Sequence, residues 1–457
     1  MLVIVSDLHL GDGTTAASIP PSAFHLFANR LREMAYFASF RKDGAYRPIT
    51  ELDVLLLGDI LDPIHSTVWL DTHPGAVNFV RPWTDSTSPF FARKLATATR
   101  SILDHQLNRE SFAVLKRLAA GTEIRLPPAM ANGRPDMQSN ERVSPVVRLH
   151  YMVGNHDWYY GLQGPAFDAI RRTVIDRLGL HNTPAPFPSD LGEAPEIAEV
   201  LRRYQVYARH GDIYDKFNYS QERGRNSATL GDVFAMEVLN RFPVEVENRF
   251  GNQLPKPIID SLRRITNVRP ALATSLWISG QIKRHASNPA LEDELKKVWN
   301  DLCDHFLEIP FVKEQDKAFQ FDLVDAMQLV LKISQRTSFQ TLNDIVIWVR
   351  DKLSEQERSF AEHALHEPAF LNDTARFIVY GHTHHHEIIS LDSHGRPPSE
   401  QSQLYLNSGT WHTYFDLAIK NPDAQKFIAH QSITYLTFYK DDEREGRHFE
   451  AWSGTYA

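Results

Sequence analysis

Five short clusters of aspartate, histidine and asparagine recur along the 457-residue chain, and each follows a short apolar run. The first is Asp7-Leu8-His9, in which alternation along an extended segment places the carboxylate and the imidazole on the same side. The others are GDILD at 58–62, GNHD at 154–157, HGD at 210–212 and GHTH at 381–384. Carboxylate, amide and imidazole groups without a thiolate suit hard and borderline divalent cations. The sequence therefore predicts a metal site to which all five clusters contribute.

The residue types also indicate what such a site would do. They suit Mn, which we expect first, as well as Fe, Zn, Co and Ni, and the spacing does not choose among these metals. Two cations about 3.5–4 Å apart can supply a hydroxide nucleophile and polarise phosphoryl oxygens, which serves displacement at phosphorus. Any one cluster alone is usually a turn or a surface feature, so it is their joint occurrence that favours a site.

Short buried strands must position these clusters. Apolar runs bounded by turn residues precede them at 2–5, 54–57, 149–153, 205–208 and 377–380. Each cluster thus lies at the carboxyl end of a predicted strand, where ligands of open α/β sheets collect.

The remaining patterns predict the fold class. Helical patterns at 24–40 and 166–178 alternate with the strands, and further strands are expected at 404–406, 433–438 and 449–452. This order predicts an α/β (α+β) fold of two packed mixed β-sheets flanked by helices. The C-terminal strands are expected to form the second sheet, packed on the first.

Two intervals are too long to be ordinary connections. The first, at about 63–145, has a helical pattern at 90–118, and the second, 215–375, has apolar stripes at 291–307, 321–333 and 342–349. We therefore expect a catalytic domain of residues 1–214 and 376–457 with an insertion at about 63–145. Residues 215–375 are expected to form a mainly helical cap insertion.

Composition narrows the class of protein. The apolar share of 42% and the charged share of 23% are typical of soluble globular proteins. The single cysteine, Cys303, excludes an intramolecular disulfide and a thiolate zinc site, and packing is its expected role. No segment reads as a signal peptide or a membrane span, so a cytoplasmic location is expected.

Taken in order, the clusters resemble the DxH, GDxxD, GNHD, His and GHxH pattern of the calcineurin-like metallophosphoesterase superfamily. The resemblance implies a metallophosphoesterase β-sandwich, two divalent cations and hydrolysis of a phosphate ester or anhydride. It also implies the ligands: Asp7, His9 and His384 for one cation, Asp59 as the bridge, and Asn155, His210 and His382 for the other.

The same resemblance implies roles for three residues that do not bind metal. His156 would face the phosphate and protonate the leaving oxygen, and Asp157 would orient His156. Asp62 would hold the ring of an imidazole ligand. His385 and His386 extend the last cluster, and a solvated turn is expected for them.

Three short sequence motifs bring the chain nearest to one branch of the superfamily. HGD at 210–212, GHTH at 381–384 and LNSGTW at 406–411 are similar to the branch containing bacterial UDP-2,3-diacylglucosamine pyrophosphatases. Those enzymes also carry a helical cap after the fourth motif.

The first part of the expected cap is basic. Residues 202–284 hold 14 Lys and Arg against 8 Asp and Glu, whereas the rest of the chain holds 35 against 49. Lys216, Arg223 and Arg225 either hold an extended anionic substrate by charge-assisted hydrogen bonds or form a solvated helical face. Phe217 and Tyr219 could stack a base or pack.

Three functions are compatible with these features. The first is hydrolysis of a phosphodiester or pyrophosphate bond in a phosphorylated, nucleotide-linked or similar small molecule, by a metal-activated hydroxide. The alternative is a metal-dependent nuclease of the same superfamily, which the basic segment favours and the net charge of −8 opposes. A non-catalytic scaffold has no chemical need for seven ligands and a proton donor.

Overall fold

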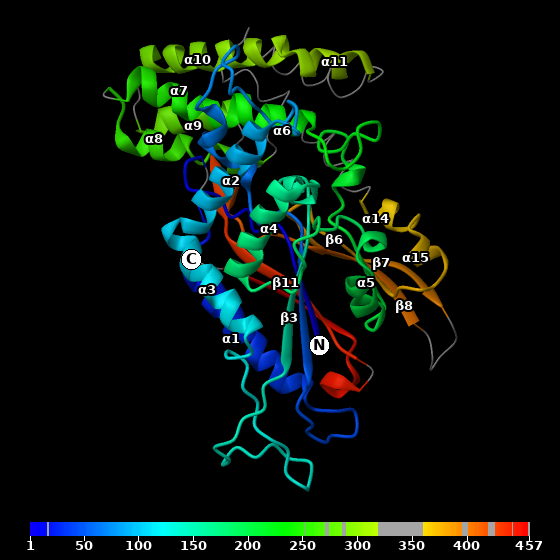
Figure 1. The fold of residues 1–457 in the computed structure, drawn as a ribbon. Helices are drawn as coiled ribbons and strands as arrows, with labels where there is room; N and C mark the ends of the chain where they lie inside the picture. The colour runs from blue at the N-terminus through cyan, green and yellow to red at the C-terminus, as the bar shows by residue number, and fades with distance from the viewer. Residues whose placement is uncertain are drawn as a thin grey trace.

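The computed structural model describes residues 1–15, 18–251, 253–269, 274–285, 289–318, 360–394, 401–418, 426–440 and 442–455. Over these ranges the chain has a mixed α/β structure. Two mixed β-sheets lie at its centre, with helices around them (Figure 1).

The first sheet contains the strands that precede the first three clusters. Its order is β12 (Phe449–Thr455), β11 (Ser432–Phe438), β1 (Leu2–Val5), β2 (Glu51–Leu57) and β3 (Val146–Met152). Strands β1, β2 and β3 run parallel, whereas β11 is antiparallel to both β1 and β12. The carboxyl ends of the three parallel strands therefore share one edge.

The second sheet contains the strands that precede the last two clusters. Its order is β4 (Val206–Ala208), β6 (Phe377–Tyr380), β8 (Gln401–Ser408) and β7 (His386–His394). Strands β4, β6 and β8 run parallel, and β7 is antiparallel to β8.

Alternate strand residues fill the layer between the two sheets. Leu2 and Ile4 of β1 lie in one apolar cluster with Val379 of β6, whereas Val3 and Val5 lie in the cluster on the opposite face. This is the period of two that a strand imposes. A one-residue slip of β1 would exchange these two sets, so burial on both faces fixes its register.

Four helices pack on the outer apolar cluster of the first sheet: α1 (Pro21–Ala38), α2 (Pro89–Asp104), α3 (Gln106–Ala119) and α4 (Pro165–Leu178). The single helical pattern expected at 90–118 is two helices, because His105 is extended (φ −57°, ψ 135°) between them. Helix α5 (Pro195–Arg202) instead buries Ile197 and Leu201 against the layer between the sheets.

All five strands expected before the clusters are present, but the expected grouping of the C-terminal strands is wrong. Only β8 joins the second sheet, because β11 pairs with β1 and β12 pairs with β11. A period of two identifies a strand and its buried face without identifying the strand that it pairs with.

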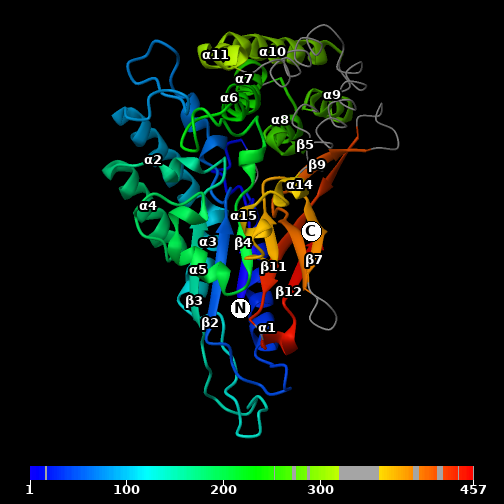
Figure 2. The same cartoon turned by 90° about the vertical axis from the view of Figure 1, so that its right-hand side faces the viewer.

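The helices of residues 230–318 gather at one end of the molecule (Figures 1 and 2). The expected stripe at 291–307 lies on one helix, α10, which buries Leu295, Val298 and Trp299, while the patterns at 321–333 and 342–349 fall outside the described residues. The helices are α6 (Leu230–Phe234), the π-helix η6 (Ala235–Asn240), α7 (Arg241–Phe250), α8 (Lys256–Leu262), α9 (Thr274–His285), α10 (Pro289–Glu308) and α11 (Pro310–Ala318).

A three-stranded sheet ties these helices to the C-terminal part of the chain. In it, β5 (Val268–Arg269) runs parallel to β9 (Tyr414–Leu417), which pairs with β10 (Phe427–His430). Helices α14 (Phe360–Ala364) and α15 (Pro368–Leu371) lead back to β6. No helix among the described residues is long and apolar enough to cross a membrane. Short 3₁₀ turns complete the fold: η1 (Pro63–His65), η2 (Thr67–Leu70), η3 (Trp158–Gly161), η4 (Leu191–Glu193), η5 (Asp212–Tyr214), η7 (Ile265–Asn267) and η10 (Glu443–Gly446).

Candidate metal centre

The five clusters meet where strands of the two sheets end. Asp7, Asp59 and Asn155 follow β1, β2 and β3, while His210 and His382 follow β4 and β6. The predicted convergence is therefore confirmed, and it brings together side chains from both ends of the chain. All seven predicted ligands lie within this region, most of them buried.

The backbone at the clusters is strained. Nine non-glycine residues have positive φ within the described ranges, and five of them are predicted ligands. Such a conformation costs on the order of 1–3 kcal/mol per residue and persists where the surroundings enforce it, often at functional sites. The five are Asp7 (φ 54°), His9 (44°), Asp59 (55°), His382 (69°) and His384 (65°).

Three positions beside the clusters leave no room for a side chain, so glycine is required there. A Cβ on Gly58 would lie 2.5 Å from Nδ1 of His210, and one on Gly154 would lie 2.7 Å from Cδ2 of the same ring. A Cβ on Gly381 would lie 2.7 Å from Oδ2 of Asp7. Since real Cβ atoms do not approach so closely, the bare backbone lets the ligands reach one another.

One group of potential ligands consists of Asp7, His9 and His384, whose ligand atoms lie within 4.8 Å of one another. The Nε2 atoms of His9 and His384 are 3.0 Å apart, and Nε2 of His384 is 3.3 Å from Oδ1 of Asp7. That Asp7 oxygen is buried and accepts no hydrogen bond. A buried, unsatisfied carboxylate oxygen facing two imidazole nitrogens fits a divalent cation, which would satisfy all three.

A second group consists of Asp59, His210 and His382, with Asn155 beside them. Oδ2 of Asp59 lies 3.2 Å from Nε2 of His210 and 3.8 Å from Nε2 of His9, so this carboxylate stands between the two groups. Oδ1 of Asn155 lies 3.2 Å from Nε2 of His210 and 2.9 Å from Nδ1 of His382. These buried groups could hold metal ions.

Hydrogen bonds fix which nitrogen is presented by three of the four predicted imidazole ligands. Nδ1 of His9 meets Oδ2 of Asp62 at 3.0 Å, Nδ1 of His210 meets the Leu57 carbonyl at 2.9 Å, and Nε2 of His382 meets Oδ2 of Asp215 at 3.1 Å. Because a carbonyl or carboxylate oxygen only accepts, each of these nitrogens carries its proton. The other nitrogen of each ring then has a lone pair for a cation.

Asp62 holds more than the one ring expected of it. Its Oδ2 accepts from Nδ1 of His9 at 3.0 Å, of His156 at 3.1 Å and of His65 at 2.7 Å. The side chains of His9, Asp62 and His156 also come close enough for a third cation group. Their contacts are hydrogen bonds to one oxygen, which account for the arrangement without a metal.

The role expected of Asp157 belongs to Asp62 instead. The Asp157 carboxylate accepts from the backbone N–H groups of Ile60 at 2.9 Å and Gly154 at 2.6 Å, and from the hydroxyl of Tyr151 at 2.6 Å. It therefore fixes the turns that carry Asp59 and Asn155 rather than the ring of His156. Burial and the nearby Asp59 charge raise the pKa of Asp157 to about 6.

Carboxylates dominate the electrostatics of the imidazoles. Burial alone lowers the pKa of His9, but Asp62 and Asp7 outweigh it and raise that pKa to about 10. In His210 burial is likewise outweighed, chiefly by Asp59 and Asp7, and the pKa rises to about 9. The negative charge that stabilises protonated rings here is also what would attract a divalent cation.

The three basic residues expected to bind substrate lie in different settings. Arg225 is mostly buried, pairs with Asp212 and donates to the Val153 carbonyl at 3.0 Å. The guanidinium of Arg223 lies 4.4 Å from the ring centre of Phe311, and Lys216 is exposed. Arg225 thus has a structural role in this conformation. Substrate binding stays a prediction for all three.

The sequence does not single out three residues that lie close to the predicted ligands or to Asp62. Asp215 holds the ring of His382, His65 binds Asp62, and His412 is buried with its ring 5.9 Å from that of His9. Asp215 and His412 each follow a cluster or strand end, which is a weak signal, whereas nothing in the spacing of His65 marks it. Cys303 is buried, in agreement with a packing role.

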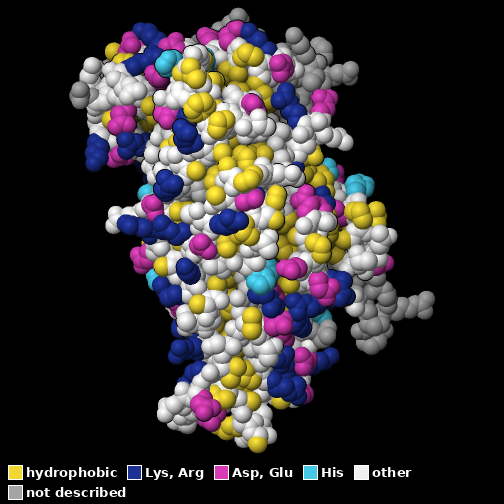
Figure 3. Space-filling view, in the orientation of Figure 1, with side chains coloured by type: hydrophobic (Ala, Val, Ile, Leu, Met, Phe, Trp, Pro, Cys, Tyr) yellow, Lys and Arg dark blue, Asp and Glu magenta, His cyan; other side chains and the backbone are white. Residues whose placement is uncertain are grey.

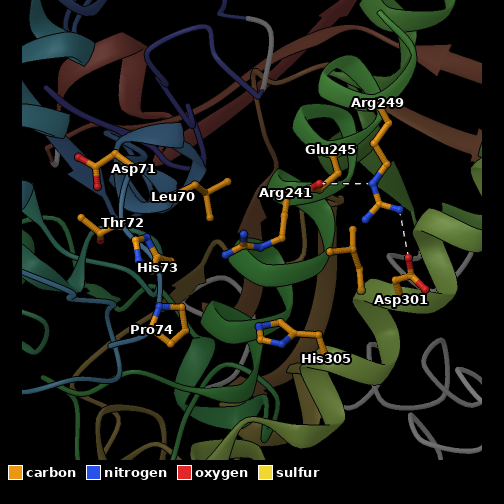
Figure 4. Close-up of a pocket in the computed structure, with 11 residues that line it drawn as sticks. Leu70, Asp71, Thr72, His73, Pro74, Arg241, Glu245, Arg249, Asp301 and His305 are labelled. Carbon is orange, nitrogen blue, oxygen red and sulfur yellow. Dashed lines mark hydrogen bonds and ion pairs between the residues drawn. The ribbon is translucent and has the colours of Figure 1, made fainter. Parts of the chain in front are cut away.

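A cavity of about 360 Å³ lies outside the ligand groups, between residues 70–74 and helices α7 and α10 (Figure 4). Arg249 crosses one side of it, 3.6 Å from Glu245 and 3.1 Å from Asp301. None of the predicted ligands lines this cavity. The cavity is therefore separate from the candidate metal centre.

No protein-family model matches the chain, and a search of the curated proteins finds no match.

Proposed function

We propose that this protein is a binuclear metal-dependent phosphoesterase. It would hydrolyse a phosphodiester or pyrophosphate bond in a nucleotide-linked or similar small substrate. The observation that carries this proposal is the pair of buried ligand groups that share the Asp59 carboxylate. The likeness of the clusters to those of calcineurin-like metallophosphoesterases supports the reaction class.

We assign the predicted ligands to two cations and propose that both are Mn²⁺. Asp7, His9 and His384 would hold one, Asn155, His210 and His382 the other, and Asp59 would contact both. When bound, the cations would supply Lewis acidity, which lowers the pKa of water and polarises phosphoryl oxygens. The protein contributes fixed ring orientations and a buried, strained backbone that hold the ligands in place.

His156 is the proposed proton donor to the leaving oxygen. Its Nδ1 is bound to Asp62, so Nε2 is the atom free to act, and its side chain is 19% exposed where that of Asp62 is 2% exposed. Burial alone lowers the pKa of His156, but Asp62 and Asp59 outweigh it and raise that pKa. These carboxylates favour the protonated ring that a general acid requires.

Two variants test this proposal, one expected to change turnover and the other expected to change metal content. With Mn²⁺ and an aryl phosphodiester, His156→Asn is expected to lower kcat by about 10²- to 10⁴-fold while metal content, measured by elemental analysis, stays at two per chain. Asp59→Asn is expected to lower metal content itself, since it removes a charge next to both groups. His150→Asn is the control, because His150 is a buried histidine bound to Asp53, away from the clusters.

Two results would contradict the proposal. An Asp59→Asn protein that keeps both metals would exclude the shared ligand, and wild-type protein that binds metal but hydrolyses no phosphate ester or anhydride would exclude the reaction. The substrate panel should hold aryl phosphomonoesters and phosphodiesters, nucleotide sugars, cyclic nucleotides and single-stranded DNA.

A nuclease remains the second candidate because residues 202–284 are net basic. Many of these charges are already paired in the structure, as Arg263 is with Glu247 and Arg241 with Glu237. On the face in Figure 3, basic and acidic side chains intermingle rather than forming one basic tract. DNA binding that weakens steeply with salt would favour the nuclease over a small-molecule phosphoesterase.

A further inference from the structure

One buried side chain outside the predicted ligand groups has no role in the reaction as proposed above. His65 lies in the 3₁₀ turn η1, three residues after Asp62, and is 7% exposed. Its ring centre is 5.1 Å from that of His156, yet the two rings make their hydrogen bonds to the same third group.

His65 donates hydrogen bonds to both oxygens of the Asp62 carboxylate. Its backbone N–H donates to Oδ1 at 3.2 Å, and its Nδ1 donates to Oδ2 at 2.7 Å. Two bonds from one residue to the two oxygens fix the plane of the carboxylate as well as its position. With its plane fixed, Oδ2 faces Nδ1 of His9 at 3.0 Å and Nδ1 of His156 at 3.1 Å.

The turn that carries His65 is itself held from three directions. The Pro63 carbonyl accepts from Nε1 of Trp69 at 2.7 Å, and the His65 carbonyl accepts from Oγ1 of Thr15 at 2.8 Å. The Ile64 carbonyl accepts from Nδ2 of Asn240 at 2.8 Å, and Asn240 belongs to the π-helix η6. Every carbonyl of the turn is thus bound by a side chain from a different segment. Because the turn is buried, its carbonyls need such partners, and these bonds hold the turn and His65 in one place.

We infer that His65 is a positioning residue of the active site, acting through Asp62 on His156 and His9. This inference rests on the proposed phosphoesterase function. The hydrogen bonds of the His65 ring and backbone N–H go to Asp62, and its part is to hold the Asp62 carboxylate where one oxygen can orient both rings. Residues that orient ligands and acids in this way typically change metal affinity or activity by about 10- to 100-fold when removed.

The test compares side chains that place a donor at different positions. In Asn the amide nitrogen can occupy the place of Nδ1 of histidine, whereas in Gln it reaches the place of Nε2. We expect His65→Ala and His65→Gln to lower kcat for an aryl phosphodiester by about 10- to 100-fold at saturating Mn²⁺, with KM within about twofold of wild type. His65→Asn is expected to recover most of that kcat.

Controls separate positioning from general damage. His150→Ala removes another buried histidine–aspartate contact, with Nε2 of His150 3.2 Å from Oδ1 of Asp53. It should destabilise the protein without lowering kcat. If His65→Ala is not recovered folded, the comparison of Asn with Gln decides alone.

Three outcomes would overturn the inference: an unchanged kcat in His65→Ala, equal losses in the Asn and Gln variants, or an equal loss in His150→Ala. If wild-type protein with bound metal is itself inactive on every phosphate substrate, the proposed function fails instead. The two failures are therefore distinguishable.

Discussion

At the scale of single residues, hydrogen bonds and steric limits set the geometry of the candidate site. Three of the four predicted imidazole ligands, His9, His210 and His382, keep one nitrogen bound to an acceptor, which leaves the other nitrogen for a cation. Glycines then let the rings approach, since a Cβ on Gly154 would overlap the ring of His210. Small side chains therefore matter here as much as the ligands do.

Gly154→Ala tests this steric requirement. The added Cβ would overlap Oδ1 of Asp59 and would lie 2.7 Å from Cδ2 and 2.8 Å from Nε2 of His210, so both predicted ligands must move. We expect metal affinity or kcat to fall by about 10- to 100-fold, because a displacement of about 1 Å at a reacting centre has effects of this size. Metal titration followed by kinetics on an aryl phosphodiester measures both.

Gly11→Ala is the matched control, because a Cβ there meets nothing within 4 Å. It should leave metal binding and turnover near wild type. Wild-type metal affinity and turnover in the Gly154 variant would show that the His210 ring has room to adjust.

At the scale of elements, the sequence predicts strands and cluster positions well and partners poorly. The runs before Asp7 and His382 match β1 and β6 because short buried strands have a local signature. The pairing of β1 with β11 joins the two ends of the chain, and no local pattern encodes it. The break at His105 was missed because apolar residues continue through it with helical spacing.

The site shows the same division between local and distant information. The cluster spacing predicts which residues converge, since each ligand sits next to a strand end. The contacts of Asp62 with His65 and of Asp215 with His382 depend on turn geometry and on a loop from another part of the chain. The resemblance to metallophosphoesterases implies that Asp157 orients His156, whereas in the structure the ring of His156 is hydrogen-bonded to Asp62.

The π-helix η6 gives a prediction at this scale. Nδ2 of Asn240 donates to the Ile64 carbonyl at 2.8 Å, and both groups are buried. Asn240→Ala would leave that carbonyl without its donor, so we expect the free energy of unfolding to fall by about 1–3 kcal/mol. Asn248→Ala, at an exposed position in the following helix α7, should change it by less than about 0.5 kcal/mol. Denaturant titration measures both, and equal effects would show that the Asn240 bond adds no stability.

At the scale of the whole molecule, a buried ion cluster joins the segment at 69–81 to the helices of residues 230–318. Arg81 is fully buried and donates through Nε to Oε1 of Glu237 in η6 at 2.7 Å. Its remaining nitrogens bind carbonyls of the 69–80 segment, including that of Thr72 at 3.0 Å. Arg241 also pairs with Glu237, so one carboxylate holds two guanidinium groups from different segments. Removing that carboxylate would leave a buried, unpaired cation, which is strongly destabilising.

The charge of Glu237 makes this junction dependent on pH. The groups facing it are Arg81, Arg241 and His305, whose Nε2 is 3.7 Å away. Burial alone raises the pKa of Glu237, but His305 and the two arginines outweigh it and lower that pKa from 4.5 to about 2. A carboxylate whose pKa is lowered in the folded protein stabilises the fold fully when the pH is above its pKa in the unfolded chain. That stabilisation is lost as the pH falls toward its pKa in the folded protein.

Full protonation of Glu237 is expected to lower the free energy of unfolding by about 3 kcal/mol, of which about 1 kcal/mol is lost by pH 3.5. Glu237→Gln cannot titrate at this position, so its deficit in unfolding free energy relative to wild type should be largest at pH 6 and about 1 kcal/mol smaller at pH 3.5. Urea titrations of both proteins at the two pH values measure the difference. Glu33→Gln, in the exposed pair with Arg30, should show no such narrowing, because exposed pairs contribute little. A deficit for Glu237→Gln that stays constant between the two pH values would mean that Glu237 keeps an ordinary pKa in the folded protein, and the junction would then owe its stability to packing.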